Sequence, residues 1–90
     1  MSEVLSAEEQ AALVALAEAC NWSINAHVSV EAFTRKFKTH LRGDAKKTLK
    51  KLKKRGYCTP HPTGGSTTYQ LTDPGLIEAK LILARSSETR

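Results

Sequence analysis

The sequence predicts a mainly helical α+β domain with a three-helix core, a two-stranded hairpin and a fourth, C-terminal helix. Three observations predict it: apolar residues recur with a helical period before residue 56, a β-rich segment containing Gly-Gly follows, and an Asp-Pro pair then opens another helical pattern. A chain of 90 residues encloses a single hydrophobic core, so we expect one domain over residues 1–90. Its ends, about 1–4 and 86–90, are expected to fray.

The first helix is predicted to begin after Ser6, because a serine followed three residues later by Glu9 matches a capping box. In this motif each of the two side chains binds a backbone N–H near the helix start. In the alanine-rich stretch that follows, a helical period brings one set of apolar residues to a common face, which we expect to pack on the core: Leu13, Leu16, Ala17 and Cys20.

A second helix is expected over residues 30–40, with Ser29 as its N-cap. Gly43 is expected to end it, and Asp44 to cap a third helix that runs to Arg55. Gly56 follows at a position suited to a left-handed C-cap.

The third helix has the clearest segregation of side chains in the sequence. With about 100° between successive residues, Ala45, Leu49 and Leu52 fall on one side. A stripe of lysines falls on the opposite side: Lys47, Lys50, Lys51 and Lys54.

Two β-strands are predicted on either side of Gly64-Gly65, with Tyr69 and Leu71 facing inward. Pro60 and Pro62 indicate that the first of these strands lies at a sheet edge, because proline has no N–H to donate.

The fourth helix is expected to start with Asp73 as cap and Pro74 in its first turn. Its core-facing side is expected to contain Leu76, Ile77, Lys80, Leu83 and Ala84. Leu81 and Ile82 then point outward, and we consider them as the seam of a homodimer.

Charge is distributed unevenly along the chain, whose net charge is +5. Residues 1–28 carry a net charge of −4, residues 56–90 carry none, and residues 29–55 hold eleven Lys and Arg against two acids, a net +9. So dense a positive segment favours a polyanionic partner, although a solvated lysine face that aids solubility is the alternative.

Two short motifs flank the predicted hairpin. The first, L-x-x-L-x-x-x-G-Y, ends in Gly56-Tyr57, and the second, Y-x-L-T-x-x-G, runs from Tyr69 to Gly75. In this order, around a glycine-rich turn, they resemble winged helix-turn-helix regulators of the MarR-like and PadR-like kind, over roughly residues 29–80. The resemblance implies a winged helix whose third helix enters the major groove of duplex DNA, and a transcription regulator that needs no cofactor.

The predicted contacts with DNA follow from that placement and from the charge. Residues of the third helix would face the groove, with Lys53, Lys54 and Arg55 nearer the phosphates, while cations of the second helix would bind a flanking phosphate run. The candidate nucleic-acid-binding residues are Arg35, Lys36, Lys38, Arg42, Lys46, Lys47, Thr48, Lys50, Lys51, Lys54, Ser66 and Thr67. Because lysine lacks the planar fork of arginine, we expect strong phosphate attraction and weak discrimination between bases.

Other classes of protein are disfavoured. Cys58-x-x-His61 has metal-like spacing, but no second tight pair completes a zinc site, and no nucleophile has an evident base, so we expect neither a metal nor an enzyme. Two cysteines and no long apolar run predict a cytoplasmic protein with reduced thiols and no membrane contact. Two alternatives stay open: an RNA-binding or ribosome-associated module, and a protein-interaction domain that docks an acidic partner.

Overall fold

The computed structural model of the protein describes residues 5–62 and 67–88. In that part of the chain the helices are α1 (Ala7–Ala19), α2 (Val30–Thr34), the 3-10 helix η1 (Thr39–Leu41), α3 (Arg42–Lys54) and α4 (Asp73–Glu88). The strands are β1 (Val28–Ser29), β2 (Cys58–Pro62) and β3 (Thr67–Leu71). The fold is therefore α+β and mainly helical, as the sequence predicts.

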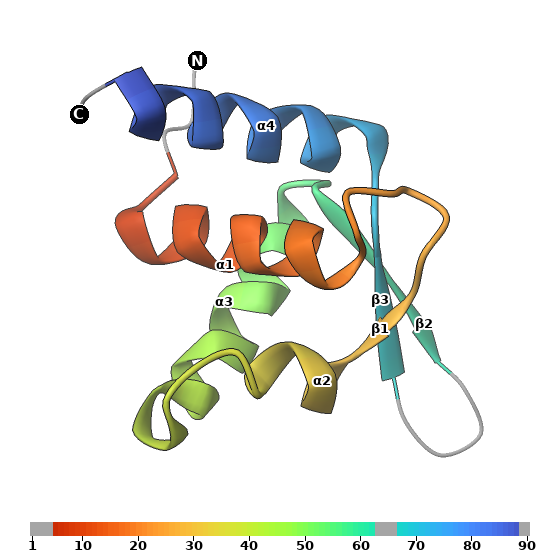
Figure 1. Ribbon diagram of the computed structural model, residues 1–90. Helices are drawn as coiled ribbons and strands as arrows, with labels where there is room; N and C mark the ends of the chain where they lie inside the picture. Colours follow the sequence, from red (N-terminus) through yellow and green to blue (C-terminus); the bar gives the residue numbers. More distant parts are fainter. Residues whose placement is uncertain (1–4, 63–66, 89–90) are drawn as a thin grey trace.

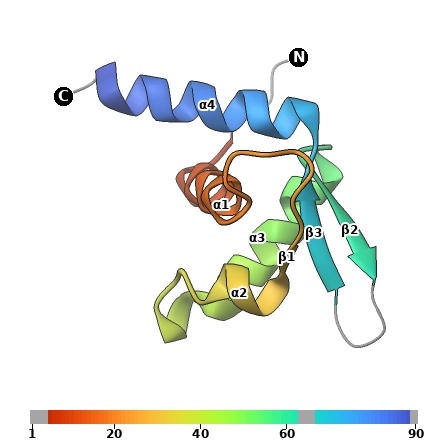
Figure 2. The same ribbon diagram turned by 45° about the vertical axis from the view of Figure 1, so that its right-hand side comes forward.

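Helix α1 is the centre of the arrangement. Helix α4 covers one side of it, and α2 and α3 lie on the other side, as Figures 1 and 2 show. Its buried residues Leu13, Leu16 and Ala17 belong to the same apolar cluster as Phe33 of α2 and Leu49 of α3. The amphipathic face predicted for this helix is confirmed, since Cys20 is buried too.

The predicted capping box at the start of α1 is also confirmed. The backbone N–H of Ser6 donates to Glu9 Oε1 at 2.9 Å, and the backbone N–H of Glu9 donates to Ser6 Oγ at 3.1 Å. Glu9 is itself almost completely buried, so the motif fixes the point at which α1 enters the core.

The second helix is much shorter than expected. Ser29 caps it as predicted, its Oγ accepting from the N–H of Ala32 at 3.1 Å, but α2 ends at Thr34. Beyond that point the N–H groups of Lys36 and Phe37 bind carbonyls three residues back, which makes turns instead of α-helix. The helical period of the sequence does not distinguish these two geometries over so few residues.

The start of α3 was predicted incorrectly as well. The helix begins at Arg42, directly after η1, so Gly43 and Asp44 lie inside its first turn. A glycine in the first turn costs less than one in the helix interior, and the Asp44 carboxylate interacts favourably with the positive end of the helix dipole. At the other end Gly56 adopts φ +84°, as a left-handed C-cap requires.

The strands form one antiparallel sheet with the order β1-β3-β2. The predicted hairpin pairs β2 with β3 in the register Cys58↔Leu71 to Pro62↔Thr67, and β2 is an edge strand, as its prolines predict. The two-residue strand β1, which pairs Val28 with Tyr69, was not predicted.

Helix α4 is capped by Thr72, not by Asp73, because Thr72 Oγ1 accepts from the N–H of Gly75 at 3.1 Å. The orientation expected for its apolar residues is wrong for Ile82, which is 8% exposed and faces the core together with Ala79. Ile77 is 59% exposed and faces outward, as Leu81 does. Gly75 and Ala79 lie on the buried face with Ile82, and the side predicted to face the core is exposed at Ile77 and Leu83.

Candidate nucleic-acid interface

The two faces of α3 differ as the sequence predicts. Ala45, Leu49 and Leu52 are buried, and Leu52 is fully inaccessible in the core. All six lysines of the helix are exposed: Lys46, Lys47, Lys50, Lys51, Lys53 and Lys54. We call these six residues the lysine face.

An ion pair fixes the C-terminal end of α3 against α1. Arg55 Nε lies 3.0 Å from Glu9 Oε2, and a second guanidinium nitrogen lies 3.4 Å from Oε1. The backbone N–H of Ser6 and the Arg55 guanidinium stabilise the ionised carboxyl and lower the pKa of Glu9, against the opposing effect of burial. Arg55 therefore has a structural partner, and the expectation that it contacts phosphate loses its support.

The carboxylates of the described residues do not neutralise the lysine face. Within residues 5–62 and 67–88, no lysine of α3 forms an ion pair with a carboxylate. On one flank of this face Lys51 and Lys54 share a hollow of about 460 Å³ with Glu8 and Glu9. Lys46, Lys47, Lys50 and Lys53 do not line that hollow.

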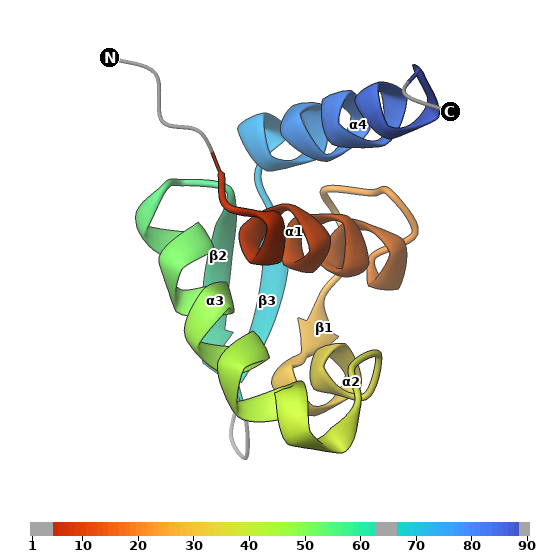
Figure 3. The ribbon, with the colours of Figure 1, turned by 90° about the vertical axis from the view of Figure 1, so that its left-hand side faces the viewer.

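Further cations lie between α2 and α3. Arg35, Lys36 and Lys38 are exposed, and Arg42 is half-buried with its Nε donating to the carbonyl of Phe37 at 3.3 Å. The end of the molecule opposite α4 holds three parts of the chain (Figures 1 and 3). They are the segment that carries these cations, the first turn of α3, and the C-terminal end of β2 with the N-terminal end of β3.

Thr48 does not belong to this surface. Its side chain is only 9% exposed, and its hydroxyl donates to the carbonyl of Asp44 at 2.8 Å. The helical period already placed it beside Ala45 and Leu52, so this signal was present in the sequence. Of the two hairpin candidates, Thr67 is half-buried at the start of β3, and Ser66 lies outside the described residues.

The thiols are buried in the interior. Burial, with Cys20 nearby, raises the pKa of Cys58 to about 12, and burial also raises the pKa of Cys20. The Cys58-x-x-His61 spacing does not assemble a site, because residues three apart in a strand point to opposite faces of the sheet. In the described part of the chain, no three His, Cys, Asp or Glu side chains are grouped so that they could hold a metal ion.

The contact between His61 and His27 was not predicted from the sequence. Their ring centroids lie 4.6 Å apart, on the sheet face that also holds Thr68, whose hydroxyl donates to the His61 carbonyl at 3.2 Å. Among the described residues, His61 Nε2 is buried without a hydrogen-bond partner. Because 34 positions separate the two histidines in the sequence, no local pattern could have predicted their contact.

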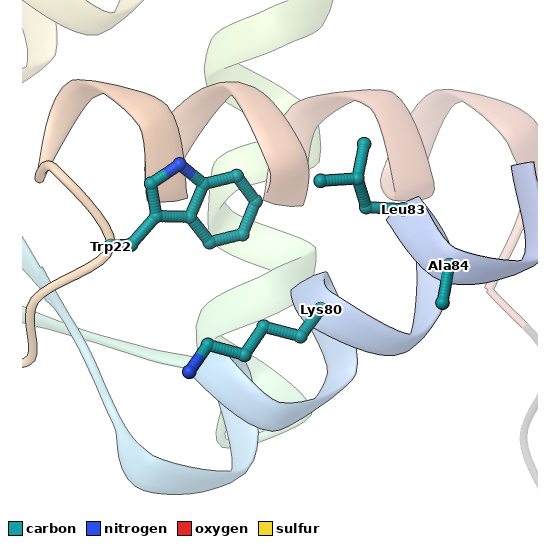
Figure 4. A pocket seen from close by; sticks show the side chains of 4 residues that line it. All are labelled: Trp22, Lys80, Leu83 and Ala84. Atoms are coloured by element: carbon teal, nitrogen blue, oxygen red, sulfur yellow. The ribbon is translucent and has the colours of Figure 1, made fainter. Parts of the chain in front are cut away.

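An apolar hollow of about 410 Å³ lies on α4, far from the lysine face. It is lined by Trp22, Lys80, Leu83 and Ala84, and the indole of Trp22 points toward Leu83 in Figure 4. Asn21 and Trp22 both adopt φ +56° in the turn after α1, and this turn brings the indole over α4.

Within the described residues, no helix combines the length and apolar character needed to cross a bilayer.

Comparison with known proteins does not assign the chain to a family. No protein-family model matches it, and no curated protein matches it.

Proposed function

We propose that this protein is a winged-helix DNA-binding domain that acts as a cytoplasmic transcription regulator and catalyses no reaction. Its support is the order of the elements: two helices, a basic third helix, an antiparallel hairpin and a closing helix. In this proposal α3 is the recognition helix and the β2–β3 hairpin is the wing.

The dimensions of α3 suit the major groove. The helix has 13 residues and is therefore about 20 Å long, and the groove of B-form DNA admits one α-helix. With its leucines packed on α1, the helix presents ammonium groups to the phosphates that border the groove. Arg35, Lys36 and Lys38 then contact phosphates beside the groove.

One observation carries the proposal: the six cations of the lysine face are exposed, and the described carboxylates leave them unpaired. A lysine face maintained only for solubility would be equally effective with acids interspersed. A uniformly positive helix instead increases the affinity for duplex DNA, because each phosphate that it neutralises releases counterions.

The test is charge reversal in matched pairs. K47E/K50E on α3 and K80E/R85E on α4 change the net charge by the same amount, but only the first pair lies on the lysine face. We expect K47E/K50E to lower the affinity for a mixed-sequence duplex by at least about tenfold, since it turns two phosphate contacts into repulsions. K80E/R85E should lower it far less.

A further variant, K47E/K50E/K51E/K54E, should abolish binding and keep the circular dichroism spectrum of the native protein. Equal losses in the two matched pairs would mean that net charge, and not this helix, governs binding. The interpretation as a recognition helix would then be wrong. Stronger binding to a structured RNA than to the duplex at the same salt concentration would favour the RNA-binding alternative.

We also propose that α4 mediates a homodimer, as the sequence suggested, but through a different set of residues. Ile82 faces the core, whereas Ile77, Leu81 and Leu83 are 59%, 48% and 46% exposed. Two-fold symmetry would then present two copies of α3 to one duplex. Sedimentation equilibrium of the wild type and of L81E tests this, and a monomeric wild type at 100 times the DNA-binding concentration would refute it.

A further inference from the structure

We infer that the protein binds duplex DNA with little preference for base sequence, an inference that rests on the proposed function. The lysine face offers few of the groups that discriminate between base edges. In the major groove the usual specific contacts are arginine or lysine on guanine and asparagine or glutamine on adenine, and lysine lacks the rigid planar fork of arginine. The exposed positions from 43 to 54 carry only Gly43, Asp44 and the six lysines.

Three of the side chains on or beside α3 that could have supplied such contacts have partners within the protein. Arg55 forms its ion pair with Glu9, and the Nε of Arg42 donates to the carbonyl of Phe37. Thr48, the only hydroxyl on α3, faces the interior and donates to the carbonyl of Asp44. Only the Asp44 carboxylate is left as an acceptor, and it is repelled by the phosphates around it.

The hairpin offers no compensating contact. Proteins that sense DNA shape insert arginine or lysine into a narrow minor groove. The sequence contains no Lys or Arg between Arg55 and Lys80, a segment that includes both strands and the turn that joins them. The wing therefore has no lysine or arginine with which to read groove width.

Ammonium groups on flexible side chains are suited to binding phosphates without regard to base sequence. Each lysine of the face is a point charge that adjusts to the nearest phosphate, and phosphates have the same spacing in every sequence. The partner is thus the DNA backbone itself. Any choice among genomic sites would depend on abundance, on a second copy of the chain or on another protein.

The experiment compares three duplexes of equal length, one A·T-only, one G·C-only and one of mixed sequence, with the full chain at fixed salt. Fluorescence anisotropy should give dissociation constants within about fivefold of one another, below the roughly 10³-fold gap that separates specific from non-specific binding in sequence-reading proteins. Selection from a pool of random duplexes should yield no consensus.

Two results would overturn the inference, and they differ. A consensus bound more than about 100-fold tighter than the mixed duplex would refute sequence independence and leave DNA binding intact. No detectable binding to any of the duplexes would refute the proposed function, and this inference with it. As a positive control for the assay, K47R/K50R introduces two planar forks and should preserve affinity while it raises the preference for G·C.

Discussion

Gly75 lies directly against the carbonyl of Tyr57. A Cβ placed on Gly75 would be 2.0 Å from that oxygen, well inside van der Waals contact. The same junction is closed by Thr72, whose hydroxyl donates to the Gly56 carbonyl at 2.6 Å and whose N–H donates to the Tyr57 carbonyl at 3.3 Å. The start of α4 is thereby fastened to the turn that ends α3.

Substitution of Gly75 by alanine should therefore destabilise the protein. Because the obstacle is backbone and not a flexible side chain, we expect a loss of about 1–3 kcal/mol in the free energy of unfolding, measured by urea titration. Gly43→Ala is the matched control, since nothing lies within 4 Å of the added Cβ. It should leave stability unchanged or raise it slightly, and equal losses in both variants would contradict the close contact.

The Glu9–Arg55 pair predicts a pH-dependent stability. The folded pKa of Glu9 is lowered, so its contribution is complete above the unfolded value of about 4.3 and disappears as the pH falls through the lower, folded value. Glu9→Gln should cost about 1–3 kcal/mol at pH 7, and this difference from the wild type should shrink at acid pH. Glu18→Gln, on an exposed part of the same helix, should show neither effect.

The unequal surroundings of the lysines predict unequal roles. Lys51 and Lys54 line a hollow with Glu8 and Glu9, whereas Lys47 and Lys50 do not. K47E/K50E should therefore weaken DNA binding more than K51E/K54E does, since the Glu8 carboxylate beside the second pair offsets part of its field, whereas Glu9 is already paired with Arg55. Equal losses of affinity in anisotropy titrations would show that the neighbouring carboxylate does not reduce the contribution of Lys51 and Lys54 to DNA binding.

A steep dependence on salt should accompany binding. If six to ten phosphates are contacted, affinity should fall by about 10³–10⁵ between 50 and 200 mM salt. The slope of log K against log salt counts these contacts, and it should decrease by roughly one for each lysine that is replaced by alanine. A flat dependence would contradict the whole assignment of the lysine face.

The opposite orientations of two neighbours on α4 can be tested through stability. Ile82 is 8% exposed, so Ile82→Ala should cost about 2–4 kcal/mol through the cavity it leaves. Leu81 is 48% exposed, and Leu81→Ala should change the unfolding free energy of the monomer by less than about 0.5 kcal/mol. The measurement belongs at low protein concentration, where self-association does not contribute.

The sequence predicted those features that neighbouring residues determine. The capping box of Ser6 and Glu9 and the two faces of α3 depend on residues within a few positions of one another, so periodicity and motif were sufficient. The left-handed cap at Gly56 is of the same kind. These local features also located the lysine face, whereas Thr48, which was predicted to contact DNA, is buried.

Features that depend on distant contacts were not predictable in this way. Strand β1 exists because Val28 meets Tyr69, and His27 meets His61 across the same sheet. Ile82 is buried because Gly75 and Ala79 allow α4 to lie close to its neighbours, a property that hydrophobicity does not register. The break between α2 and α3 depends on whether the residues after Thr34 form α-helical or 3-10 turns. These two geometries have similar numbers of residues per turn, so the sequence pattern does not separate them.

The two edges of the sheet have a consequence for aggregation. Pro60 and Pro62 remove N–H donors from β2, and β1 at the opposite edge is only two residues long. A foreign strand thus finds no continuous row of donors and acceptors to extend. The protein should withstand high concentration without forming intermolecular β-structure, even though its overall stability depends on a small core.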